Sequence, residues 1–366
     1  MTMKKIDLTK DLNRCFGNNI EILKSIPDNS IDCCVTSPPY YGLRSYLDDD
    51  DPKKVDEIGL EESPDAYIAR MVALYSEIRR TLKPEGTCFI NIGDSYYNYR
   101  GGKGQALTKQ TSSKTKQDLP DKCARRANKH EGLKEKDLIG IPWMLAFALR
   151  ADGWYLRQEI IWAKACSGIH RGGTVMPESC KDRFVRSHEQ VFLLTKNSHY
   201  FFDIDAIAEK QAECSLNRAF SNNHMEKRKG IGDEQYSISG KSQAKSYEKL
   251  RKKIESGEEI TRNRRSVWTI NTRPSKISHF ASYPAELIEP MILSGCPVGG
   301  IVLDPFAGTG TTGIVANLHG RKALLLELND EYKPLYKKRL AEITKQHASD
   351  GKETVAGKIV KKKKLF

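Results

Sequence analysis

The short segment Ser37-Pro38-Pro39-Tyr40 ends an apolar run in "DCCVTSPPYYGLRSY". Ser37 offers a hydroxyl oxygen, and the carbonyl of Pro38 is a second acceptor whose direction the proline rings fix. Two fixed acceptors could draw the hydrogens of an exocyclic amine on cytosine or adenine, which would free the lone pair for attack on a methyl group. The ring of Tyr40 could stack on a base that has left a double helix. We interpret residues 37–40 as a clamp for an amino base; the alternative is a Pro-Pro turn with core tyrosines.

A second segment, Gly308–Gly313, matches the pattern G-x-G-x-x-G. It follows an expected strand at 301–303 and opens an expected helix, and Glu327 lies about 20 residues on, where an acid can hold a ribose. A nicotinamide dinucleotide would place its pyrophosphate here. Asp304 would repel that group, but it could accept from the ammonium of S-adenosylmethionine, directly or through water, while Phe306 lined the adenosine or sulfonium pocket. We therefore favour S-adenosyl-L-methionine as the cofactor.

Alternating strands and helices must position these two segments. A strand at 31–35 leads into Ser37, and a helix follows in "SPDAYIARMVALYSEIRRT", with Ser63 as its cap and Pro64 in its first turn. Strands are expected in "TCFINIGDSY", "YLRQEIIWAK" and "SHEQVFLLTKNSHYFFD", and helices in "IGIPWMLAFALRADGW" and "SYPAELIEPMILSG". The alternation indicates one doubly wound parallel sheet.

Composition limits the class of protein. The chain has 366 residues, a formal net charge of +13 and 39% hydrophobic residues. That charge favours a polyanionic partner such as nucleic acid, although a solvated lysine surface would give the same total. The nine cysteines form no CxxC pair. We expect reduced thiols, a cytoplasmic location, no membrane contact and no metal site.

Taken together, these motifs resemble those of the β-class amino DNA methyltransferases, in which the catalytic motif precedes the cofactor motif. The segment "VTSPPY" is similar to the signature of the cytosine-N4 subfamily, whose adenine-N6 relatives more often carry Asp or Asn at the position of Ser37. The resemblance implies a Rossmann-like, S-adenosylmethionine-dependent fold with a doubly wound mixed sheet and a smaller inserted target-recognition region. It also implies double-stranded DNA as substrate, with a possible cognate restriction endonuclease as a partner, and a monomer or homodimer.

The same resemblance assigns site residues. It implies that Ser37, Pro38, Pro39 and Tyr40 are catalytic. It implies cofactor contacts from Asp304, Phe306, Ala307, Gly308, Thr309, Gly310, Thr311 and Glu327, and from Phe280, Ala281 and Ser282 in "HFASYPAELIEPMI". Asn18 is a departure, because the family often has Asp after the glycine. Its amide can still accept a hydrogen bond, which leaves its part at the cofactor or the target base open.

The expected organisation has four parts. Residues 11–207 form the catalytic part, with an insertion at about 98–137. Residues 208–265 form the target-recognition region, residues 266–345 the cofactor-binding part and residues 346–366 a basic tail. The leading hypothesis is transfer of a methyl group to cytosine N4 in duplex DNA. The first alternative is transfer to adenine N6 by the same machinery. Two further alternatives are a dinucleotide-dependent oxidoreductase and a nucleic-acid-binding protein with a degenerate methyltransferase fold.

Overall fold

The structure is a computed structural model that describes residues 6–43, 45–97, 130–165, 180–211, 252–253, 255–257, 260–272 and 283–349. The chain divides into two units, of which the first comprises Met1–Phe202 and Ser266–Phe366 and the second Asp203–Arg265. Most of the expected insertion at 98–137, the residues from 350 onward and the predicted contacts Phe280, Ala281 and Ser282 lie outside the described residues. In the described ranges, no helix is both long and apolar enough to cross a membrane.

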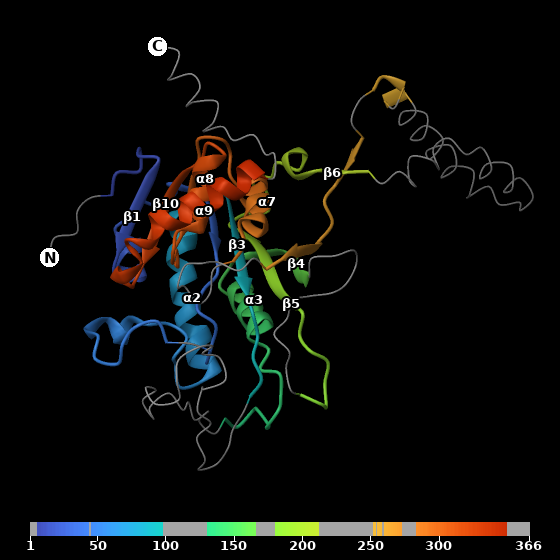
Figure 1. Cartoon of the computed structure of the whole chain (residues 1–366). Coiled ribbons are helices and arrows are strands. Elements are labelled where there is room, and N and C mark those ends of the chain that lie inside the picture. The colour runs from blue at the N-terminus through green and yellow to red at the C-terminus, as the bar shows by residue number, and fades with distance from the viewer. Residues whose placement is uncertain are drawn as a thin grey trace, which may run out of the picture. The chain divides into compact units, whose positions relative to one another are not determined.

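An eight-stranded sheet forms the centre of the first unit (Figure 1). Its order is β1-β10-β9-β2-β3-β5-β4-β8. The strands are β1 (Leu12–Phe16), β2 (Ile31–Thr36), β3 (Leu82–Ile92), β4 (Tyr155–Ala165), β5 (His188–Thr195), β8 (Val267–Asn271), β9 (Ile301–Asp304) and β10 (Lys322–Glu327). In the described part of the second unit, β6 (Glu209–Lys210) pairs antiparallel with β7 (Thr261–Arg262).

The sheet is mixed. Strands β1, β10, β9, β2 and β3 run parallel, whereas β5 is antiparallel to both β3 and β4. The alternation of elements predicted a wholly parallel sheet and was wrong on this point, whereas the mixed Rossmann-like sheet implied by the family resemblance is confirmed. The reason is that β4 and β5, which follow one another among the described strands, are direct neighbours in the sheet and pair antiparallel.

Helices cover both faces of the sheet. One hydrophobic core lies against α1 (Asn19–Lys24), α2 (Pro64–Thr81) and α3 (Ile141–Ala151). The other core lies against α7 (Ala285–Gly295), α8 (Thr311–Leu318) and α9 (Leu335–Ser349). Neighbouring strand residues alternate between the two cores, with Cys34 in the first and Cys33 and Val35 in the second. Such double coverage explains why β2, β9 and β10 are almost completely buried.

Helix α2 begins where its sequence predicts. The Ser63 hydroxyl accepts from the backbone N–H of Ala66 at 3.1 Å, and Pro64 occupies the first helical position. Helix α9 corrects one expected boundary, because it continues from Leu335 through Ser349 and the expected start of the tail at 346 falls inside it.

Candidate active site

The carboxyl ends of β2, β9 and β10 meet at one edge of the sheet, where a cavity of about 360 Å³ opens. This is the edge at which open α/β sheets bind ligands. The predicted clamp lines the cavity with Ser37, Pro38, Pro39 and Tyr40, and the predicted cofactor loop lines it with Phe306, Gly308 and Glu327. The two motifs, far apart in the chain, therefore face one common space.

Not every predicted site residue reaches that space. Asn18, Asp304, Ala307, Thr309, Gly310 and Thr311 are described by the structure but are absent from the cavity wall. Thr311 instead accepts at 3.0 Å from the guanidinium of Arg339, which joins α8 to α9. Their roles as direct cofactor contacts receive no support from this geometry.

Asp304 is a fully buried carboxylate at the end of β9. Its Oδ1 accepts from the Thr36 hydroxyl at 2.7 Å and the Phe306 N–H at 3.1 Å, and its Oδ2 accepts from the hydroxyls of Tyr283 at 2.9 Å and Thr312 at 2.5 Å. Burial raises the pKa of this carboxyl, and the four hydrogen bonds act against that rise. Because its acceptor positions are occupied, Asp304 joins the end of β2 to the glycine loop and is unsuited to the direct ammonium contact expected of it.

Asn18 also has a different place from the one expected. Its Oδ1 accepts from the N–H groups of Ile20 and Glu21 at 2.9 and 3.2 Å, so the side chain caps α1. Its Nδ2 donates to Asp56 at 2.7 Å. Asp56 and Asn19 line the cavity, whereas Asn18 stands behind them. The amide therefore orders the cavity wall.

Glu327 lies at the end of β10, as predicted. Its carboxylate accepts from the N–H of Gly308 at 2.7 Å and the N–H of Asn329 at 2.9 Å. Burial raises the pKa of Glu327 to about 7, although these backbone donors act in the opposite direction. An acceptor group held in the cavity beside a glycine turn suits the hydroxyl pair of a ribose.

The glycine loop needs its glycines for shape. Gly308 and Gly310 have φ values of 52° and 86°, in the left-handed region that other residues rarely adopt. A Cβ on Gly310 would also come within 2.6 Å of the Tyr336 ring. The tight turn keeps the Gly308 backbone at the cavity.

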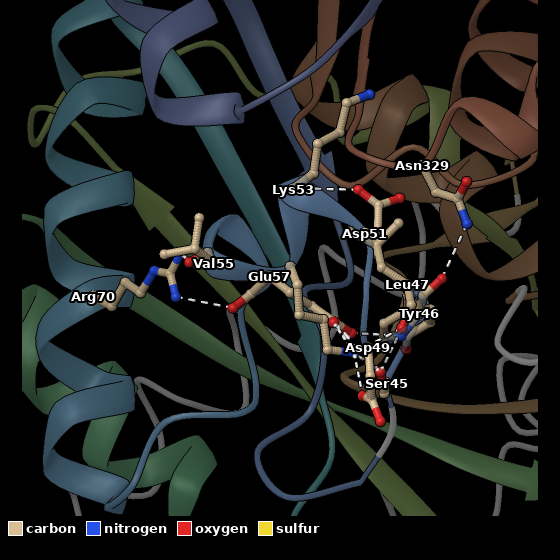
Figure 2. A network of polar contacts seen from close by, with 11 residues as sticks. Ser45, Tyr46, Leu47, Asp49, Asp51, Lys53, Val55, Glu57, Arg70 and Asn329 are labelled. Carbon is tan, nitrogen blue, oxygen red and sulfur yellow. Dashed lines mark hydrogen bonds and ion pairs between the residues drawn. The ribbon is translucent and has the colours of Figure 1, made fainter.

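A polar network orders the strap, defined here as residues 45–59, and several strap residues line the same cavity. Figure 2 shows this network. Its centre is the Glu57 carboxylate, which accepts from the Tyr46 N–H and pairs with the Lys54 ammonium at 2.9 Å. The Glu57 side chain is only 2% exposed. Asn329 donates to the Tyr46 carbonyl at 3.0 Å, and Arg70 on α2 donates to the Glu57 carbonyl at 2.9 Å. The strap is thus fastened to α2 and to the loop that follows Glu327.

Sequence reasoning missed the polar residues beside Ser37. Asn91 on β3 donates through Nδ2 to the Ser37 hydroxyl at 3.3 Å and the Tyr40 hydroxyl at 2.9 Å. The Tyr40 hydroxyl donates to Glu189 on β5 at 2.5 Å, and the other Glu189 oxygen pairs with Lys164 on β4. All five residues line the cavity. Asn91 in "FINIG" is a polar residue inside an apolar strand, a signal that was available in the sequence. Glu189 lies in the polar start of β5, "HEQ", and gave no such signal.

A separate group of possible metal ligands joins three helices on the face covered by α7, α8 and α9. The ligand atoms of Glu289, His319 and His347 lie within 4.8 Å of one another, and His319 hydrogen-bonds Glu289 at 3.0 Å. None of the three lines the cavity. No spacing in the sequence suggested this group.

Comparison with known proteins places this site in a family. A family model described as DNA methylase (N6_N4_Mtase) matches residues 31–338, a range that spans both motifs. The chain belongs to this family of N4/N6 DNA methyltransferases. It is 38% identical over 325 residues to the type II methyltransferase M.Cfr9I of Citrobacter freundii, covering 88% of this chain and 86% of that one. It is 37% identical over 341 residues to M.SmaI of Serratia marcescens, covering 91% and 93%.

Among solved structures, the fold is similar to that of the cytosine-N4-specific PvuII DNA methyltransferase. The TM-score is 0.52 at 16% identity, and the match covers 90% of this chain and 86% of that one. Membership of the family confirms the expected DNA methyltransferase, with S-adenosyl-L-methionine as its methyl donor. The cavity suits this cofactor, since its volume is that of a small-molecule site and it presents a carboxylate, an aromatic ring and a backbone turn at the strand ends.

Proposed function

We propose that this DNA methyltransferase methylates the exocyclic N4 amine of cytosine in double-stranded DNA. The observation that carries the proposal is that Ser37 lines the same cavity as Phe306, Gly308 and Glu327. The serine itself favours cytosine through the resemblance to the cytosine-N4 signature. Adenine N6 is the second candidate, because the same acceptors would serve its amine.

The chain's own residues prepare the amine. S-adenosyl-L-methionine supplies a methyl group bonded to a positively charged sulfur. The Ser37 oxygen and the Pro38 carbonyl accept the two amine hydrogens, which localises the nitrogen lone pair. With the cofactor bound, the nitrogen would bond to the methyl carbon while the electron pair of the carbon–sulfur bond stayed on sulfur. The methylated nitrogen would then release its extra proton to water and remain on the base as a neutral N-methylamino group.

The corner that holds Ser37 is fixed before any substrate arrives. The Tyr67 hydroxyl on α2 donates to the Pro39 carbonyl at 2.9 Å, and Thr36 binds the buried Asp304. These contacts tie the clamp to a helix on one side and to the cofactor loop on the other. Preorganised acceptors of this kind lower a barrier without reorganisation during the reaction.

For the remaining parts of the molecule, we propose that the second unit, Asp203–Arg265, contributes to recognition of the DNA sequence. We further propose that the modification protects DNA against a cognate restriction endonuclease. The basic charge of the chain supports a duplex substrate, because each phosphate contact by Lys or Arg adds affinity.

The test is a methyl-transfer assay with nucleoside analysis. The protein is incubated with methyl-labelled cofactor and unmodified duplex DNA, which is then digested to nucleosides and separated. N4-methylcytosine is the expected product. N6-methyladenine would replace the proposal with its alternative, and absence of label from DNA would refute both.

A further inference from the structure

We propose that Glu189 is a positioning residue that makes Ser37 a hydrogen-bond acceptor toward the target amine. The proposal rests on the proposed methyl transfer to an exocyclic amine, cytosine or adenine. A serine hydroxyl can donate or accept, and only an acceptor draws hydrogens from an amine. Something in the protein must therefore direct the Ser37 hydrogen away from the substrate.

The Glu189 carboxylate determines which hydroxyl donates and which accepts in this chain of hydrogen bonds. An ionised carboxylate only accepts, so the Tyr40 hydroxyl must donate its single hydrogen to Glu189, at 2.5 Å. The Tyr40 oxygen is then left as an acceptor. Ser37 is a hydrogen-bond partner of Tyr40. Because the Tyr40 hydrogen is already used, the Ser37 hydroxyl has to be the donor in this pair. With its hydrogen committed there, Ser37 faces the cavity with a lone pair.

The side-chain amide of Asn91 is oriented in agreement with these hydrogen-bond directions. Its Nδ2 lies 3.0 Å from Glu189, 2.9 Å from the Tyr40 hydroxyl and 3.3 Å from the Ser37 hydroxyl. Turning the amide over would point its oxygen at the carboxylate, so the Nδ2 must face these three oxygens. The Asn91 Oδ1 is buried and makes no hydrogen bond within the described part of the chain. That orphaned acceptor costs free energy, which the contact with a charged group offsets.

Lys164 holds the Glu189 carboxylate in its orientation. Its ammonium pairs with the Glu189 oxygen that does not bind Tyr40, and the Glu189 side chain is 13% exposed. In a Glu189→Gln variant, the Lys164 cation would attract the amide oxygen. The amide nitrogen would then face Tyr40 and Asn91 as a donor, which reverses the polarity at nearly unchanged shape.

The experiment is a double-mutant cycle on methyl transfer. Wild type, Glu189→Gln, Ser37→Ala and the double variant are compared for kcat, for KM toward DNA and for cofactor Kd. Glu189→Gln is expected to lower kcat about 10- to 100-fold, with cofactor Kd within 2-fold of wild type. In the Ser37→Ala background the same change should cost less than 3-fold, since no hydroxyl remains to orient.

Glu159→Gln is the matched control, because Glu159 lies on β4 outside the cavity wall, and it should leave kcat within 2-fold of wild type. Equal losses from Glu189→Gln in both backgrounds would overturn the proposal, as would an unchanged kcat or a loss confined to cofactor binding. Total methyl incorporation is the readout, and the methylated nucleoside is identified in the same samples. A result of N6-methyladenine would therefore contradict the cytosine assignment alone, while the cycle would still report on Glu189.

Discussion

Glu327 is a carboxyl group that the fold buries at the wall of the cavity. It is held inside the cavity wall by two backbone N–H groups, and burial raises its pKa to about 7. An ordinary glutamate in the unfolded chain loses its proton near pH 4.5. Between these two values the folded protein keeps a proton that the unfolded chain has released.

This difference predicts how stability depends on pH in the cofactor-free protein. The free energy of unfolding should fall as the pH rises from about 5 to about 8, and the Glu327 contribution amounts to roughly 3 kcal/mol. Glu327→Gln removes that contribution, so its stability should fall less steeply over this range. Urea unfolding at four pH values measures both slopes, and the exposed Glu331→Gln serves as control. Parallel curves for wild type and Glu327→Gln would contradict the prediction.

At the same scale, the sequence located those site residues that lie in one short motif. Ser37, Phe306, Gly308 and Glu327 reach the cavity because a strand end or a tight turn dictates their position. Asp304 is close to these residues in the sequence, but its side chain binds the hydroxyls of Thr36, Tyr283 and Thr312 and does not line the cavity. The motif alone did not predict that orientation. The sequence did not reveal that Glu189 lies near Ser37, because only the order of strands in the folded sheet brings the two residues together.

Helix α8 illustrates what an element requires from a single residue. It begins at Thr311 after Gly310, whose positive φ turns the chain from the cofactor loop into the helix. Gly310 also packs against the ring of Tyr336, in the first turn of α9. The start of this helix therefore depends on both backbone freedom and the absence of a side chain.

Two alanine substitutions separate these requirements. Gly299 also has a positive φ, but an added Cβ there would meet nothing within 4 Å. We expect Gly299→Ala to lower the free energy of unfolding by about 1 kcal/mol and Gly310→Ala by about 3 kcal/mol. Chemical denaturation measures both. Equal losses would show that the Tyr336 ring moves aside freely.

Prediction of whole elements succeeded where apolar periodicity was long, as in α2 and α3. Strands β1 and β8 went unrecognised, because β1 is half-buried and β8 alternates exposed and buried residues at the edge of the sheet. The antiparallel orientation of β5 could not be predicted from its own residues, because the relative direction of a strand depends on the strands with which it pairs, here β3 and β4.

At the scale of the whole molecule, the dominant property is charge. A net charge of +13 acts on every phosphate of a nucleic acid that approaches the protein, whatever its sequence. The cofactor cavity, by contrast, is lined by both signs of charge, with Lys164 and Glu189 paired inside it. The two ligands should therefore respond differently to ionic strength.

Raising salt from 50 to 200 mM should weaken duplex binding by about 10²-fold or more, because cations are released from each neutralised phosphate. The Kd for S-adenosyl-L-methionine should change by less than about 3-fold over the same range. Fluorescence anisotropy of labelled DNA and calorimetry of the cofactor provide the two measurements. A DNA affinity as insensitive to salt as the cofactor affinity would argue against a phosphate-dominated interface.

The order of strands in the sheet has a consequence for synthesis on the ribosome. Strand β2, which carries the clamp, lies between β3 and β9, and β1 pairs only with β10. Strand β2 can pair early with β3 along one edge, but its other edge must wait for β9, and β1 must wait for β10. Part of their apolar surface therefore stays uncovered until late in translation, so we expect the nascent chain to need chaperones and a product truncated before β9 to aggregate.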